Sequence, residues 1–104
     1  MVEYGYLYCI SNYTIQGILN IGMTTEDPKQ KLEEANRYTF ILPVCKLEFA
    51  KKVKNPYETG EILQKILQKH KIALNTHFYR VSLDEIKLLF ELPDGEMINY
   101  NSDL

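Results

Sequence analysis

The sequence predicts a single α+β domain, in which a small, mostly antiparallel sheet of three to four strands is flanked by about three helices. Two patterns lead to this prediction. Apolar side chains recur at every second position in several short segments, which is typical of strands, and at helical spacing behind helix-start signals in others. The 104 residues suffice for one hydrophobic core. We expect residues 1–92 to form this domain, and the polar, aperiodic residues 93–104 to be a tail or the start of a linker.

The first two strands are predicted within residues 4–23, as a hairpin with a long loop. The segment YGYLYCIS alternates, and four of its bulky side chains share one face: Tyr4, Tyr6, Tyr8 and Ile10. Turn-forming residues in SNYTIQG separate it from a second apolar run, ILNIGM.

A first helix should run from Pro28 to about Asn36, because Asp27 suits the N-cap and proline the first helical position. The alternating segment CKLEFAKKV then predicts a third strand.

A second helix is expected to begin at Asn55-Pro56, where Glu58 completes a capping-box pattern. Its apolar stripe comprises five side chains: Ile62, Leu63, Ile66, Leu67 and His70.

The segment HFYRV predicts a short strand, after which Ser82 should cap a third helix, with Glu85 three residues on. Four side chains form the apolar face of that helix: Leu83, Ile86, Leu89 and Phe90.

Cys9 and Cys45 lie in apolar segments, which favours two buried thiols in the cytoplasm or another reducing compartment. A disulfide between neighbouring strands is the alternative. No segment has the length of a membrane span or the pattern of a signal peptide, so we expect a soluble, intracellular protein without membrane association.

A net charge of −2 argues against a strongly basic nucleic-acid binder. The charges are uneven, however: residues 46–71 carry seven lysines against three acids, and residues 84–104 carry six acids against one lysine. The basic stretch indicates either a modest anion-facing surface or the solvated faces of a strand and a helix.

Three segments, in their order and spacing, resemble the GIY-YIG nuclease superfamily: GYLYCISN at 5–12, GILNIGMTTEDPKQKL at 17–32 and NTHFYRVSLDEI at 75–86. The resemblance is to the phage- and large-virus-type branch, whose second motif is Lys-Ile-Gly followed by two threonines. The resemblance covers about residues 4–90. If the protein is viral, as members of this branch are, the resemblance implies that it acts inside the host cell. The two triplets of the family name correspond to Tyr6-Leu7-Tyr8 and Asn20-Ile21-Gly22.

The resemblance implies a GIY-YIG-like fold and a cleft built to hydrolyse DNA with a divalent cation, Mg²⁺ or Mn²⁺ if the chain is active. In this family a strand tyrosine helps to activate water, a helix arginine stabilises the phosphorane, and a glutamate holds the cation. The tyrosine corresponds to Tyr8. No small-molecule cofactor is implied.

The chain departs from the family pattern at four positions. Lys31 replaces the arginine and keeps its charge without the bidentate fork. His77 replaces the metal-binding glutamate, although a neutral imidazole is a poor ligand for a hard cation. Asn20 replaces the second tyrosine, and Gln64 stands where the family often has histidine.

The loop after the second strand has two interpretations. Gly22 would let the chain turn tightly, and Thr24 and Thr25 would lead into a helix whose early turns face the cleft and bind the ligand. A plain strand-to-helix turn capped by Asp27 accounts for the same residues without a ligand.

These departures favour a nuclease-fold domain with an eroded active site, which binds DNA weakly and in a salt-dependent way, or binds a partner protein, rather than cutting. A first alternative is an active endonuclease that uses Tyr8 and Lys31. Carboxylates near the cleft would favour this alternative, and Glu3, Glu33 and Glu34 are the candidates in the sequence. A second alternative is a protein-interaction module unrelated to DNA.

Overall fold

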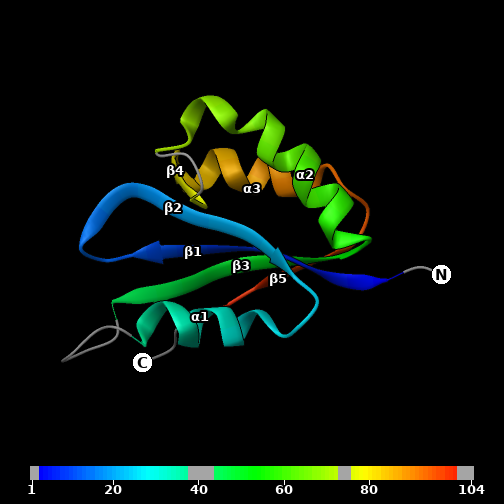
Figure 1. Ribbon diagram of the computed structural model, residues 1–104, viewed down its shortest axis with the longest axis horizontal. Helices are drawn as coiled ribbons and strands as arrows, with labels where there is room; N and C mark the ends of the chain where they lie inside the picture. Colours follow the sequence, from blue (N-terminus) through cyan, green and yellow to red (C-terminus); the bar gives the residue numbers. More distant parts are fainter. Residues whose placement is uncertain (1–2, 38–43, 73–75, 101–104) are drawn as a thin grey trace.

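The computed structural model describes residues 3–37, 44–72 and 76–100 (Figure 1). Its elements follow in the order β1 (Tyr4–Asn12), β2 (Ile15–Thr24), α1 (Pro28–Asn36), β3 (Cys45–Lys54), α2 (Pro56–Ile66), η1 (Gln68–His70), β4 (Phe78–Arg80), α3 (Leu83–Glu91) and β5 (Glu96–Asn99).

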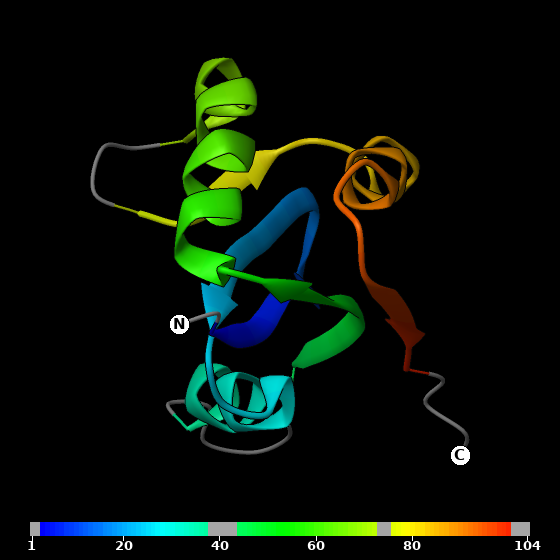
Figure 2. The same ribbon diagram turned by 90° about the vertical axis from the view of Figure 1, so that its right-hand side faces the viewer.

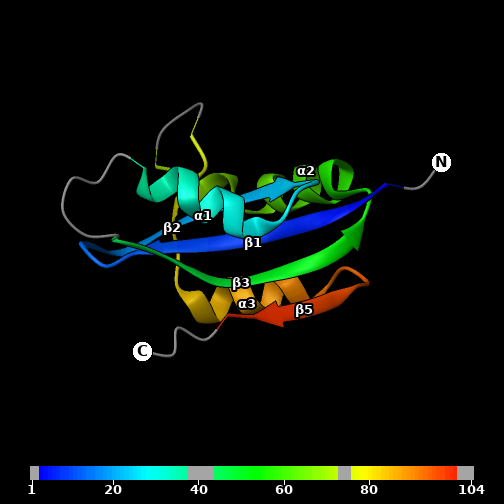
Figure 3. The same ribbon diagram turned by 90° about the horizontal axis from the view of Figure 1, so that it is seen from below.

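An antiparallel sheet lies between two helical layers (Figures 1 and 2). The sheet has five strands in the order β4-β2-β1-β3-β5. Helices α2 and α3 cover one face of the sheet, whereas α1 lies alone on the other, against β1 and β3; Figure 3 views the molecule from the α1 side. The predicted α+β class with three helices is confirmed, although the sheet has five strands rather than three to four.

The alternation in β1 distributes its side chains between two cores. Leu7 and Cys9 pack on the α2/α3 side, and Tyr8 and Ile10 pack on the α1 side, as the period of two predicts. Both faces of this central strand are therefore buried.

A β-bulge in β3 breaks the alternation that the sequence suggests. Cys9 pairs with Phe49, but the next residue of β1, Ile10, pairs with Leu47, so Glu48 is the extra residue. Phe49 consequently packs on the α2/α3 side, and Leu47 packs on the α1 side. The Ser11 hydroxyl donates a hydrogen bond of 2.6 Å to the Glu48 carboxylate at this bulge.

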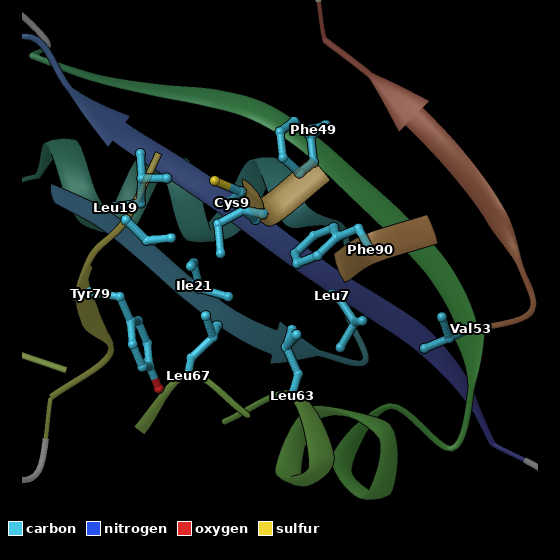
Figure 4. Close-up of a cluster of buried hydrophobic side chains, with 12 residues drawn as sticks. Leu7, Cys9, Leu19, Ile21, Phe49, Val53, Leu63, Leu67, Tyr79 and Phe90 are labelled. Carbon is cyan, nitrogen blue, oxygen red and sulfur yellow. The ribbon is translucent and has the colours of Figure 1, made fainter. Parts of the chain in front are cut away.

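The larger core lies between the sheet and the α2/α3 layer (Figure 4). Leu63 and Leu67 reach it from the α2 side, and Phe90 reaches it from α3. Phe90 is fully buried, and its ring meets that of Phe49 edge to face at a centroid distance of 5.1 Å. This face of the sheet is the principal source of hydrophobic stabilisation.

Two of the predicted helix starts are confirmed in atomic detail. The Asp27 carboxylate accepts a 2.9 Å hydrogen bond from the backbone N–H of Lys29, and the Ser82 hydroxyl accepts one of 3.2 Å from that of Glu85. Each cap satisfies a backbone donor that the first helical turn leaves unpaired.

The predicted capping box of α2 is wrong. Asn55 has a left-handed backbone (φ 51°), and its side chain makes no capping hydrogen bond. Asparagine tolerates this conformation, which the sharp entry from β3 into α2 requires. Pro56 at the start of the helix needs no donor partner.

The apolar stripe predicted for α2 is only partly buried. Leu63 and Leu67 are in the core, but Ile62 and Ile66 are 58% and 50% exposed. The α-helix ends at Ile66, and His70 lies exposed in the short 3₁₀ helix η1, off the predicted stripe. The change of helix type rotates the last residues away from the sheet.

The expectation of an unpacked tail from residue 93 does not hold for Glu96–Asn99. These residues form β5, which pairs with β3, and Met97 packs against the larger core. A four-residue edge strand has too few apolar residues to show a period, so the sequence alone did not reveal it.

Both cysteines are free thiols, so the disulfide alternative is wrong. Cys9 is fully buried, and burial raises the pKa of its thiol strongly, with the Glu48 carboxylate adding to the shift. Cys45 is only partly buried, because it opens β3 at the end of the sheet.

Candidate functional site

A cleft of about 350 Å³ opens between α1 and the face of the sheet that α1 leaves partly uncovered. Its lining comes from β1, β2, α1 and the residue before β4: Tyr8, Asn20, Gly22, Met23, Lys31, Glu34, Ala35 and His77. Residues separated by up to 69 positions, Tyr8 to His77, thus meet at one place.

Tyr8 lies across β2 because the residue opposite it is glycine. Tyr8 of β1 pairs with Gly22 of β2, and a Cβ atom on Gly22 would fall 2.5 Å from the Tyr8 hydroxyl and 2.8 Å from Cζ. No side chain larger than hydrogen fits there without displacing the ring. The role predicted for Gly22, a tight turn at the strand end, is therefore wrong: it lies inside β2 and makes room for Tyr8.

Lys31 and Glu34 bring opposite charges into the cleft from one side of α1. Lys31 Nζ lies 3.4 Å from a Glu34 carboxylate oxygen, and both side chains are partly exposed. Three-residue spacing places them on neighbouring positions of the helix surface. Glu34 is the one of the three carboxylates considered from sequence that lines the cleft, whereas Glu3 and Glu33 do not.

His77 closes the cleft on the β4 side. Its carbonyl accepts a 2.9 Å hydrogen bond from the backbone N–H of Ile21, which fixes the residue against β2. Its ring nitrogen Nδ1 lies 3.4 Å from Gln64 Nε2 on α2. Gln64 does not line the cleft, so it acts on the site only through His77.

Asn20 lies on the floor of the cleft in β2. Within the described part of the chain its Oδ1 is buried without a hydrogen-bond partner. A buried carbonyl oxygen without a donor is costly, and such atoms are uncommon in folded proteins. This polar group has no explanation in the packing around it.

Thr24 and Thr25 do not line the cleft. Thr24 is buried, and its hydroxyl accepts a 3.0 Å hydrogen bond from the backbone N–H of Glu26, while Thr25 is exposed. These contacts agree with the plain-turn interpretation, since they stabilise the loop between β2 and α1 without a ligand.

The environment of Tyr8 keeps it protonated at neutral pH. Burial raises the pKa of its phenol, and the nearby Glu34 carboxylate raises it further. The side chain can therefore donate a hydrogen bond to an anion in the cleft, but it is a poor base.

The cleft does not fit a hard divalent cation. Among the described residues, no group of three or more His, Cys, Asp and Glu side chains is arranged to hold a metal. The cleft offers one carboxylate, which is paired with Lys31, together with the Asn20 amide oxygen and the His77 imidazole. Magnesium prefers several oxygen ligands, which this donor set does not provide.

A larger hollow, of about 750 Å³, lies elsewhere, between α2 and α3. It is lined mainly by aliphatic side chains such as Ile62, Ile66 and Leu92, which are half or more exposed. Nothing in the structure shows what covers it, and it contains none of the residues predicted for catalysis.

Comparison of the chain with known protein families, curated proteins and solved structures finds no match. Over the described ranges, the helices are all too short or too polar to cross a lipid bilayer.

Proposed function

We propose that this chain is a GIY-YIG-like domain that binds a nucleic-acid phosphate in the cleft beneath α1 and does not cut it. The observation that carries the proposal is the convergence of Tyr8, Lys31 and His77, from three distant segments, on one polar cleft with Asn20 and Gly22. A packing role would not require a lysine, a histidine and a tyrosine to share one solvent-open hollow.

The groups in the cleft suit an anion. The Lys31 ammonium supplies the charge, and the Tyr8 phenol supplies a neutral hydrogen-bond donor. The His77 ring adds a donor in one tautomer, while Gln64 holds its other side. These contacts hold a phosphate as point donors, without the fork that arginine would offer.

Three features favour binding over hydrolysis. Tyr8 stays a phenol at neutral pH, so it does not activate water. Lys31 is already paired with Glu34, which competes with a phosphate for its charge. The donor set around the cleft does not suit a magnesium ion. With neither a base, an unpaired cation nor a set of oxygen ligands suited to a metal, these residues would give the transition state little stabilisation.

The test of binding is fluorescence anisotropy with a labelled DNA duplex over a series of salt concentrations. We expect weak, salt-dependent binding, and we expect Lys31→Ala to reduce the slope of log K against log salt by about 0.9, the value for one phosphate contact. Lys87→Ala, which removes an exposed lysine on α3, is the matched control and should leave the slope unchanged. Binding that ignores salt would contradict the proposal and favour a protein partner.

Glu34→Gln should tighten binding about two- to fivefold, because it frees Lys31 from an exposed ion pair worth up to about 1 kcal/mol. Unchanged affinity in this variant, together with an unchanged slope in Lys31→Ala, would show that the anion lies elsewhere.

A plasmid-nicking assay with Mg²⁺ and with Mn²⁺ tests the absence of cleavage. We expect no nicking by the natural chain. A Lys31→Arg, His77→Glu variant restores the arginine and the glutamate that the family resemblance implies. It serves as the comparison in which any latent nicking activity should be easiest to detect. Nicking by the natural chain that disappears in Tyr8→Phe would overturn the proposal in favour of an active endonuclease.

A further inference from the structure

The uncovered end of the sheet carries an exposed aromatic side chain beside the cleft. Strand β4 alternates, so Tyr79 is fully buried on the α2/α3 side while Phe78 is 48% exposed on the α1 side. Phe78 pairs with Asn20 of β2, and Arg80 pairs with Ile18. The half-exposed ring of Phe78 therefore offers an aromatic face to a ligand at this edge of the sheet.

Phe78 borders a second hollow that shares part of its lining with the cleft. This hollow, of about 300 Å³, is also lined by Ile15 and Ile18, and it shares Asn20, Glu34 and Ala35 with the polar cleft. Apolar walls, an aromatic face and the orphaned Oδ1 of Asn20 therefore lie directly beside the phosphate-binding groups.

A cluster of cations lies at the same edge of the sheet. Lys69, His70, Lys71 and Arg80 line a depression of about 270 Å³ that has no carboxylate in its lining. Within the part of the chain that the structure describes, Lys69, Lys71 and Arg80 form no ion pair, in contrast to Lys31. The Lys71 ammonium lies 5.9 Å from the centroid of the Tyr79 ring, which leaves its charge without a carboxylate partner. Cations without carboxylate partners attract an anion to this edge, although the protein has a negative net charge.

From this juxtaposition we infer that the β4 edge binds single-stranded nucleic acid: Phe78 stacks on an unpaired base, and Lys69, Lys71 and Arg80 hold the phosphates that flank it. The inference rests on the proposed function and specifies its ligand. A base inside a duplex is stacked on both faces and cannot reach a side chain in a hollow beside the sheet, whereas a single strand can turn a base outward. Aromatic faces and cations alternating along a groove are the usual means of holding such strands.

The experiment is fluorescence anisotropy with three labelled probes of equal length: a single strand, its duplex, and a strand of abasic deoxyribose phosphates. The single strand should bind most tightly. Phe78→Ala should weaken binding of the single strand about 5- to 150-fold, the effect of losing one stacked base. It should leave the duplex and the abasic strand unchanged, since neither offers an unpaired base.

Two variants separate stacking from other effects. Tyr57→Ala removes a similarly exposed aromatic ring, 55% exposed on α2, and should change nothing. Phe78→Tyr keeps the aromatic face and should bind like the natural chain. Arg80→Ala should lower the salt slope for the single strand by about 0.7.

The outcomes distinguish this inference from the proposed function. A duplex or abasic strand that binds as tightly as the single strand, or a Phe78→Ala variant that binds all probes normally, would overturn the inference while the cleft still binds phosphate. Binding of no probe at all would overturn both. Loss of single-strand discrimination in Phe78→Ala but not in Tyr57→Ala would establish the β4 edge as the base-binding region.

Discussion

The two faces of the sheet differ in how completely they are covered. On one face, α2 and α3 enclose a continuous core that includes Leu67 and Phe90, both almost inaccessible to solvent. On the other face, α1 is the one helix of the described residues that packs over β1 and β3, and a smaller core around Ile10 and Leu47 leaves the β2/β4 end open. The same strands supply both faces.

This difference places most of the buried apolar surface on one face and the proposed binding site on the other. The layer of α2 and α3 buries the larger share of the apolar side chains that stabilise the sheet. The face that α1 covers only in part leaves polar side chains and an aromatic ring in contact with solvent. A site on a sheet packed in this way keeps its geometry without a ligand.

The strongest test of this comparison is the same substitution on both faces. Leu67→Ala, at a residue 1% exposed in the larger core, should lower the free energy of unfolding by about 2–5 kcal/mol. Leu32→Ala on α1, where the leucine is only partly buried, should cost less than about 2 kcal/mol. Urea denaturation followed by circular dichroism measures both. Equal costs would show that the two faces contribute alike.

Gly22→Ala should lower the free energy of unfolding by about 1–3 kcal/mol, because the new methyl group collides with the Tyr8 ring. The same change in a Tyr8→Leu background should cost clearly less, since the ring atoms that collide are gone. A double-mutant cycle by denaturation measures this coupling. Additive costs would mean that the two residues do not hold each other in place.

Two tyrosines, one on each face, sharpen the comparison further. Within the described residues, the Tyr79 hydroxyl is buried without a partner, so Tyr79→Phe should raise the free energy of unfolding by about 1 kcal/mol. Tyr8→Phe should change stability by less than about 0.5 kcal/mol, because its hydroxyl lines an open cleft. Thermal unfolding of both variants provides the measurement, and a loss of stability in Tyr79→Phe would indicate a hydrogen bond to water.

The smallest effect concerns the ionisation of Tyr8. Its folded-state pKa lies above the ordinary value of 10.0, because of burial and the Glu34 carboxylate. Above about pH 10 the unfolded chain therefore releases this proton first, and stability falls as the pH rises.

The ionisation of Tyr8 is measured by titrating tyrosinate absorbance at alkaline pH in the natural chain and in Tyr8→Phe. The difference between the two titrations isolates Tyr8 from Tyr79 and Tyr100, whose pKa values burial also raises. Glu34→Gln should move the Tyr8 transition to lower pH. An unmoved transition would mean that Glu34 does not face the phenol.

Interactions between residues close in sequence determined most of the helices and strands. The alternation of Leu7, Tyr8 and Cys9 follows from the pleat of a strand, and the caps at Asp27 and Ser82 follow from the unpaired donors of a first helical turn. Such signals depend only on neighbours in sequence, so the sequence by itself predicts them.

The tertiary structure decided what depends on distant partners. The bulge at Glu48, the edge strand β5 and the exposure of Ile62 depend on how whole elements pair and pack. So do the pairing of Tyr8 with Gly22 and the position of Glu34 in the cleft. A carboxylate on a helix has the same sequence signature whether it faces solvent or a cleft, and only the packing of α1 against the sheet distinguishes the two.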